Sequence, residues 1–187
     1  MDLLNNDEGK LALQLARGTL EHVLLKKPVP SGQLTPVFDK KRGVFVTLTI
    51  NEQLRGCIGF PYPVMPLGDA IRQAAVAAAL EDPRFRPVSA NELPSIDLEV
   101  TVLTPPVTME GDPEDRPRKI VVGKHGLIIR GRGTSGLLLP QVATDYGWDA
   151  KTFLDHTCTK AGLSENAWHD PRVELLTFEG QIFSEHR

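Results

Sequence analysis

The sequence has no run of about 18 apolar residues, the length that a helix needs to cross a bilayer, so no membrane span is predicted. Its first residues are polar and acidic, without the basic start and apolar centre of a secretory signal. It has two cysteines, Cys57 and Cys158, too few for the disulfide framework of a small secreted protein. We therefore expect a soluble, cytoplasmic protein in which both cysteines are thiols.

The sequence also lacks an excess of positive charge, because its formal net charge is −3. A protein whose main task is to grip a phosphate backbone is usually basic, which argues against general nucleic-acid binding. Nucleic-acid contact stays an alternative through a local basic patch, and its expected members are Arg118, Lys119, Lys124, Arg130 and Arg132.

The length and composition favour a folded chain over a disordered one. Hydrophobic residues make up 41% and charged residues 24% of the sequence, as in ordinary globular proteins. The 187 residues fit one large domain over 1–187, with a core of 7–185, or two small packed lobes.

Hydrophobic periodicity predicts both helices and strands. In the first half we expect helices over 7–26 and 67–80, and strands over 43–50, 53–60 and 96–103. In the second half we expect strands over 120–122, 127–130 and 137–139, helices over 140–146 and 150–161, and a final strand pair within 173–183. A weak duplication is visible, because 43–80 and 126–161 both run strand, turn, strand, proline, helix. Two such units around one curved antiparallel sheet would cover each other's open edges.

Short segments in a fixed order carry a resemblance to a known family. They are Leu-Arg-Gly-Cys-Ile-Gly at 54–59, Asp-Pro-Arg-Phe at 82–85, and the segments 125–129, 136–143, 147–149 and 160–163, followed by Trp168. Together they span roughly residues 7–185, and in this order the chain resembles the AMMECR family.

The resemblance implies a fold and leaves the chemistry open. It implies an α+β fold of two β-α repeats packed around one barrel-like, mainly antiparallel sheet with flanking helices, in a prokaryotic, archaeal-like member. It also implies a link to Memo-like and radical-SAM proteins. The roles suggested for the family lie in nucleic-acid or translation-related regulation, and no activity is assigned to it.

Cys57 is the first candidate for a reactive group. Gly56 and Gly59 leave room for a ligand to approach the backbone. Arg55 is two residues away on the same predicted strand, so both side chains are expected on one face, where the guanidinium would favour the thiolate. Arg55 could instead hold a carboxylate or phosphate. The alternatives are an inert, buried cysteine, or a bulge that separates the two side chains.

Other candidates lie elsewhere in the sequence. His125 is a candidate general base for the thiol, a surface turn histidine, or a histidine that caps a backbone carbonyl. Arg84 is a candidate anion ligand, or a structural partner of Asp82 or Glu81. Gln141 begins a predicted helix and could bind a ligand, or it could only be solvated or cap the helix.

No spacing of residues indicates a metal site, and no cofactor is predicted. We therefore expect a ligand-binding or catalytic site around 54–59 that depends on the thiol, with an unknown small molecule or protein as partner and no membrane contact. The alternatives are an adaptor that acts with Memo-like or radical-SAM proteins and a nucleic-acid-associated regulatory factor.

Overall fold

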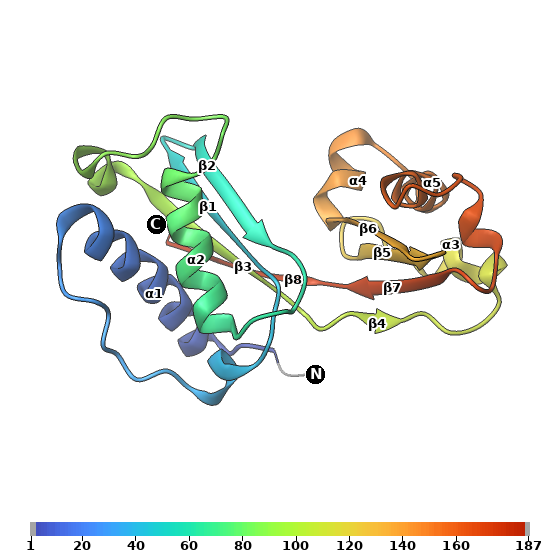
Figure 1. The fold of residues 1–187 in the computed structure, drawn as a ribbon, viewed down its shortest axis with the longest axis horizontal. Helices are drawn as coiled ribbons and strands as arrows, with labels where there is room; N and C mark the ends of the chain where they lie inside the picture. Colours follow the sequence, from blue (N-terminus) through green and yellow to red (C-terminus); the bar gives the residue numbers. More distant parts are fainter. Residues whose placement is uncertain (1–2, 186–187) are drawn as a thin grey trace. The chain divides into compact units, whose positions relative to one another are not determined.

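The computed structural model describes residues 3–185 and divides into two compact units, each built of helices and antiparallel strands (Figure 1). The first unit comprises the residues up to Thr104 and those from Gln181 onward, and the second comprises Pro105–Gly180. The α+β class is confirmed. The expectation of one barrel-like sheet is wrong, because there are two separate four-stranded sheets. Each sheet packs against its own helices over its own apolar core, so neither has to close on the other.

The first unit has a sheet with the strand order β2-β1-β3-β8. Its elements are α1 (Asn6–Leu25), η1 (Pro36–Asp39), β1 (Val44–Ile50), β2 (Gln53–Phe60), α2 (Leu67–Leu80), η2 (Ala90–Ser95), β3 (Asp97–Leu103) and β8 (Gly180–Ser184). Figure 1 shows α1 and α2 side by side, with α2 against β1 and β2. The Ala-rich sequence of α2 allows this close packing, because its small side chains are buried on several faces.

Helix α1 starts at a capping box formed by Asn5 and Glu8. The Asn5 side chain accepts the Glu8 N–H at 2.8 Å, and the Glu8 carboxylate accepts the Asn5 N–H at 3.0 Å. The helix ends where Lys26 adopts a left-handed conformation with φ of 60°. Caps of this kind satisfy backbone groups that a helix end would otherwise leave unpaired, and an N-cap contributes about 1 kcal/mol.

The β1–β2 hairpin contains a bulge that decides where the side chains of the segment 54–59 point. Its turn is Asn51–Glu52, and both residues have positive φ, as a tight two-residue hairpin turn requires. Leu48 is opposite Gly56, but Thr49 is opposite Leu54, so Arg55 is the extra residue of β2. A bulge interrupts the regular alternation of side chains. Arg55 and Cys57 therefore do not occupy successive positions of one regular face.

The two faces of the first sheet differ in polarity. Val44, Val46 and Leu48 of β1 are fully buried in the core beneath the helices. The alternate residues of β1 are only partly buried, and Thr47 lies opposite Cys57 on β2 and opposite Glu99 on β3. Because side chains alternate along a strand, these residues share the face that points away from the helices. We call this the polar face, and its members are Thr47, Thr49, Cys57, Asp97, Glu99 and Ser184.

The second unit has a sheet with the order β4-β7-β5-β6. Its elements are β4 (Val107–Thr108), η3 (Pro113–Asp115), α3 (Arg116–Lys119), β5 (Gly126–Gly131), β6 (Thr134–Leu138), α4 (Pro140–Tyr146), α5 (Ala150–Lys160), η4 (Ala167–His169) and β7 (Glu174–Phe178). Helix α5 packs on β5 and β6, and the buried Phe153 and Trp168 contribute to the core. Between residues 3 and 185, no helix has both the length and the apolarity to cross a bilayer.

Two strand predictions in the second half are wrong. The segment 120–122 leads into a turn, in which the N–H groups of Lys124 and His125 both donate to the Val121 carbonyl and Gly123 has φ of 91°. The segment 173–183 does contain two strands, β7 and β8, but they belong to different sheets. Its apolar residues indicated strands correctly without indicating which strands they would pair with.

The two sheets repeat the same connectivity. In each, a hairpin is followed by a proline and a helix, and its inner strand pairs with a later strand, β3 in the first unit and β7 in the second. The fourth strand is exchanged: β4 follows β3 in sequence but joins the second sheet, and β8 follows β7 but joins the first. The expected duplication is therefore present in the order of elements.

Candidate functional site

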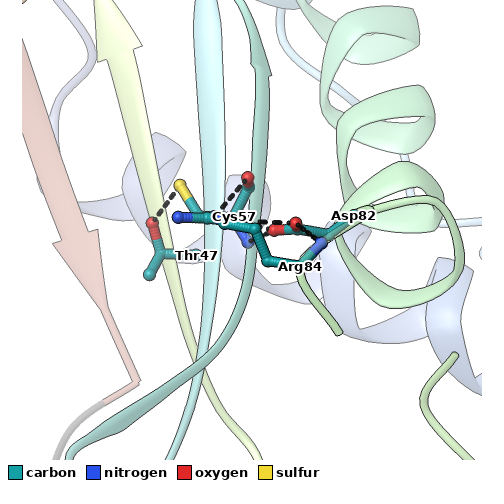
Figure 2. A network of polar contacts seen from close by, with 4 residues as sticks. All are labelled: Thr47, Cys57, Asp82 and Arg84. Carbon is teal, nitrogen blue, oxygen red and sulfur yellow. Dashed lines mark hydrogen bonds and ion pairs between the residues drawn. The ribbon is translucent and has the colours of Figure 1, made fainter. Parts of the chain in front are cut away.

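Cys57 lies partly exposed on β2, with its sulfur toward Thr47 of the neighbouring strand (Figure 2). The Cys57 Sγ is 3.2 Å from the Thr47 Oγ1, a distance at which either atom can donate a hydrogen bond. Glu99 is the next residue in the same cross-strand row, because Thr47 also pairs with it. Cys57, Thr47 and Glu99 thus form a row across three strands on the polar face, with neighbouring Cβ atoms about 5 Å apart.

The backbone of Cys57 is fixed from its other side by two residues that follow α2. β2 is the outermost strand of its sheet, so an outward N–H or C=O has no neighbouring strand to bind. The Asp82 Oδ2 accepts the Cys57 N–H at 3.0 Å, and the Arg84 Nη2 donates to the Cys57 carbonyl at 3.4 Å. Figure 2 shows Thr47 on one side of Cys57 and Asp82 on the other, with the Arg84 side chain extending from the Asp82 side to Cys57.

Asp82 and Arg84 also bind each other through a two-pronged ion pair. The Arg84 Nε donates to Asp82 Oδ1 at 3.0 Å and the Arg84 Nη2 donates to Oδ2 at 2.7 Å. The Asp82 side chain is 2% exposed, whereas that of Arg84 is 56% exposed. The hydrogen bond from Arg84 holds the pKa of the Asp82 carboxyl well below its usual range, the N–H groups of Cys57 and Arg84 add to this, and burial opposes it. The carboxylate is therefore charged at neutral pH.

Arg55 is held by Glu92 rather than placed at the sulfur. Its Nε donates to Glu92 Oε1 at 2.9 Å and its Nη2 donates to Oε2 at 3.2 Å. The hydrogen bond from Arg55, followed by the N–H of Ser89, lowers the pKa of Glu92 to about 2. This bidentate pair joins the bulge of β2 to η2. Arg55 is therefore engaged in a structural contact, and Arg84 is the guanidinium that lies beside Cys57.

Gly56 and Gly59 are required by close packing. A Cβ at Gly56 would collide with the carbonyl oxygen of Ala78 in α2, and one at Gly59 would collide with the Phe45 ring. Helix α2 can therefore approach β2 only where the strand has no side chain. The space that these two glycines leave along the segment 54–59 is therefore filled by α2 and by the Phe45 ring.

A shallow depression on the polar face is lined by Thr47, the residue that contacts the sulfur. It encloses about 240 Å³, and its lining is Thr47, Thr49, Glu52, Asp97, Leu98, Glu99 and Ser184. Thr47 connects it to Cys57, because its hydroxyl contacts the sulfur. Three carboxylates line this space, so it favours a group that is positively charged or rich in hydrogen-bond donors.

His125 and Gln141 belong to the second unit. The His125 Nδ1 accepts the Val121 N–H at 3.0 Å, and burial lowers the pKa of His125. The imidazole thus closes its own turn, as a turn histidine would, but it accepts a backbone N–H and does not cap a carbonyl. Gln141 is exposed at the start of the short helix α4, and its carbonyl accepts the Thr144 hydroxyl at 2.9 Å. Neither side chain has a described contact with Cys57.

Sequence reasoning missed Thr47 and Glu99 and gave Asp82 only a structural role. A regular hairpin around Asn51–Glu52 would place Gly56 opposite Thr47, whereas the bulge places Cys57 there. The distance of each residue from the turn indicated that Thr47 lies near the segment 54–59. The bulge hid which residue of that segment is its partner.

The expected basic patch contains charges that are already paired. Arg118 lies 3.2 Å from Asp115, Lys124 3.9 Å from Glu179 and Arg130 3.6 Å from Glu174. Pairing of this kind reduces the positive potential available to a phosphate backbone. Among residues 3–185, no group of three or more His, Cys, Asp or Glu side chains is arranged to hold a metal ion.

The comparisons with known proteins identify the family. The AMMECR1 family model matches residues 13–183. A protein of Methanosarcina barkeri is 50% identical over 188 residues, covering 98% of this chain and 93% of that protein. Protein MJ0810 of Methanocaldococcus jannaschii is 45% identical over 188 residues, covering 99% of this chain and 94% of that protein.

A solved structure agrees with this assignment. The crystal structure of the uncharacterized protein PH0010 from Pyrococcus horikoshii is 43% identical, with a TM-score of 0.79, and covers 98% of this chain and 94% of that chain. The family model and these relatives extend over both units, so the resemblance first indicated by short segments holds for the fold as a whole. The chain belongs to the AMMECR1 family.

Proposed function

We propose that this protein binds a small polar ligand on the polar face of its first sheet and acts on it through the thiol of Cys57. The observation that carries the proposal is the restraint on this residue. Its backbone is held by Asp82 and Arg84 while its sulfur stays partly exposed, 3.2 Å from the Thr47 hydroxyl. A cysteine that served only to fill the core would need no such restraint of the backbone and would be buried, as Cys158 is.

The neighbours of the sulfur suit thiol chemistry. The thiolate is the nucleophilic form of cysteine, and a nearby cation or hydroxyl donor stabilises it. The Thr47 hydroxyl can donate to the sulfur, and the Arg84 guanidinium supplies positive charge beside it. Glu99, which pairs with Thr47 in the same cross-strand row, is an acidic position that could accept a proton by way of Thr47. Because Arg84 and Asp82 form an ion pair, the net charge they place near the sulfur is small.

The depression defines the class of ligand. Its volume of about 240 Å³ is below the ~300 Å³ at which pockets for drug-sized molecules begin, so a small molecule or a single side chain fits it. Its carboxylates, Glu52, Asp97 and Glu99, favour an amine, an amidine or another donor-rich group. A ligand of this kind, held in the depression, would present its reacting atom to Cys57 past Thr47.

The test compares two thiol reagents with the same reacting group and opposite charge, and each rate is divided by the rate of the same reagent with a free small thiol. A methanethiosulfonate with an ammonium group and one with a sulfonate group both form a disulfide with the thiolate and release a sulfinate. Relative to the free thiol, we expect Cys57 of the native protein to favour the cationic reagent by a further several-fold. Glu99→Gln should reduce this preference while leaving the fold unchanged by circular dichroism.

Cys158 provides an internal control. It is fully buried, and burial raises the pKa of its thiol to about 11, so it should react only in the unfolded protein. Mass spectrometry should therefore find one label in the native chain, at Cys57, and two after denaturation. The proposal fails if native Cys57 reacts no faster than Cys158, or if its preference for the cationic reagent is no greater than that of the free thiol.

A further inference from the structure

Arg116 is a buried cation in the second unit, at the first position of α3. The residue is 5% exposed. Its Nη1 donates to the Trp168 carbonyl at 2.6 Å and its Nη2 donates to the Val173 carbonyl at 2.7 Å. Its Nε is also buried and has no hydrogen-bond partner, the only side-chain nitrogen or oxygen of which this is true among residues 3–185. An unsatisfied buried donor is costly, and native structures rarely keep one without a reason.

The charge of Arg116 is not balanced by an acid. Both its partners are neutral carbonyls, and it forms no ion pair within residues 3–185. Asp170 is near enough to influence it, but Arg172 already holds that carboxylate through two hydrogen bonds, at 3.2 Å and 3.0 Å. Burial lowers the pKa of Arg116, yet a guanidinium stays protonated in proteins, so the charge remains. A buried charge without an opposite charge is normally avoided.

The guanidinium borders a polar depression of about 340 Å³. Arg116 lines it together with Gly111, Arg172, Glu110 and Glu174. Val173, whose carbonyl binds the Nη2 of Arg116, lies between two of these lining residues in sequence. This hydrogen bond therefore joins Arg116 to the segment 172–174, whose two outer residues line the depression.

Other cations surround the same space. Arg172 stands at its rim with a side chain that is 85% exposed. The Lys119 Nζ lies beside Gly111 and donates to the Glu110 carbonyl at 3.0 Å. Gly111 has φ of 106° and carries no side chain to narrow the entrance. Of the two carboxylates in the lining, that of Glu174 lies 3.6 Å from Arg130.

We propose that this depression is a binding site for a small oxyanion, a phosphate or a carboxylate group. The oxyanion balances the charge of Arg116, accepts its Nε–H after a small shift of the lining that uncovers this buried atom, and takes a second contact from Arg172 at the rim. Planar guanidinium groups suit both kinds of oxyanion. Glu110 opposes the anion and limits its affinity. The site lies wholly in the second unit and is independent of Cys57.

Calorimetric titration of the full chain at constant ionic strength tests this proposal. Inorganic phosphate and acetate are each titrated against a background of chloride, so that the two arms distinguish a phosphate ligand from a carboxylate ligand. We expect saturable binding of one anion per chain for at least one of them. Arg172→Met should weaken it by about tenfold, the value of one hydrogen bond to a charged group, and Glu110→Gln should strengthen it.

Two further variants separate binding from stability. Arg116→Gln should abolish binding if the variant folds, and the Arg172→Met and Glu110→Gln results decide the question if it does not. Arg118→Met is the matched control, because Arg118 is exposed on the same short helix and should leave the affinity unchanged. Absence of saturable binding for both anions, or equal affinity in Arg172→Met and the native chain, would show that Arg116 only ties Trp168 to Val173.

Discussion

The Asp82 Oδ2 accepts the backbone N–H of Cys57 at 3.0 Å, so a side-chain carboxylate takes the place that a neighbouring strand would occupy at the edge of β2. Arg84 completes the arrangement by donating to the Cys57 carbonyl. An exposed strand edge readily pairs with another chain, and this pair of side chains covers the edge at one residue. It also connects the two segments that first indicated the family, 54–59 and 82–85, through direct contact.

Replacement of Asp82 should lower the free energy of unfolding. In Asp82→Ala the Cys57 N–H loses its acceptor and Arg84 loses its ion pair, so we expect a loss of about 2–3 kcal/mol in urea unfolding. Asp82→Asn should lose less, because the amide oxygen can still accept the N–H. Asp69→Asn is the control: Asp69 forms an exposed pair with Arg72, and such pairs contribute little. An Asp82→Ala protein as stable as the Asp69→Asn protein would contradict the prediction.

Stability should fall on acidification because of two carboxylates. The pKa of Asp82 is lowered in the folded chain by the hydrogen bond from Arg84, and that of Glu92 is lowered to about 2 by the hydrogen bond from Arg55. A lowered folded-state pKa stabilises the protein above the unfolded pKa, about 4, and this stabilisation is lost as the pH falls further. Urea unfolding between pH 7 and pH 2.5 measures it. Glu92→Gln should give a shallower decline below pH 4.5, and a decline as steep as that of the native chain would remove Glu92 as a cause.

A side chain at position 56 should disrupt the packing of α2 on β2. The Cβ in Gly56→Ala would collide with the Ala78 carbonyl oxygen, so the helix or the strand must shift. Overpacking of this kind costs about 1–3 kcal/mol. Gly32→Ala is the matched control, because a Cβ at Gly32 would meet nothing within 4 Å. Equal thermal stability of the two variants would show that the close packing of α2 on β2 at Gly56 does not contribute to the stability of the protein.

The Thr47 hydroxyl should influence the reactivity of Cys57. Thr47→Val keeps the shape of the side chain but removes the hydroxyl that lies 3.2 Å from the sulfur. If that hydroxyl stabilises the thiolate, alkylation of Cys57 by iodoacetamide at pH 7.5 should slow by about fivefold, the effect of one hydrogen bond of about 1 kcal/mol. Thr49→Val changes the same residue type two positions along the same face and should leave the rate unchanged. Equal alkylation rates in the two variants would show that the Thr47 hydroxyl does not affect the reactivity of Cys57.

Local features of the fold could be predicted from the sequence, whereas strand partners could not. The periodicity predicted β2 and α2 with the observed bounds, because the turn at Asn51–Glu52 and the proline at 66 delimit them. The two four-stranded sheets depend on long-range pairing, on which local propensity has no bearing. The segment 120–122 shows the limit, since its β-branched residues suited a strand but met no partner.

Two of the candidate residues named from the sequence lie together in the structure, whereas the other neighbours of Cys57 were not anticipated. Cys57 and Arg84 were singled out, and the structure brings them together. Arg55 was expected beside the sulfur, but the bulge and Glu92 direct it elsewhere. A single extra residue in a strand leaves no mark in the hydrophobic pattern, so sequence reasoning could not anticipate Thr47 as the neighbour of Cys57.

The exchange of fourth strands has a consequence for how the polypeptide is made. The strand β8 completes the first sheet, and the Gln181 side chain bonds to the backbone of Leu4, 177 positions earlier. Arg17 likewise reaches Glu185, whose carboxylate also accepts the Leu98 N–H. The ribosome must therefore finish the whole second unit before the first can close its sheet. The nascent chain has to wait with the far edge of β3 unpaired, a stage at which a chaperone or a copy of β8 supplied as a peptide could bind.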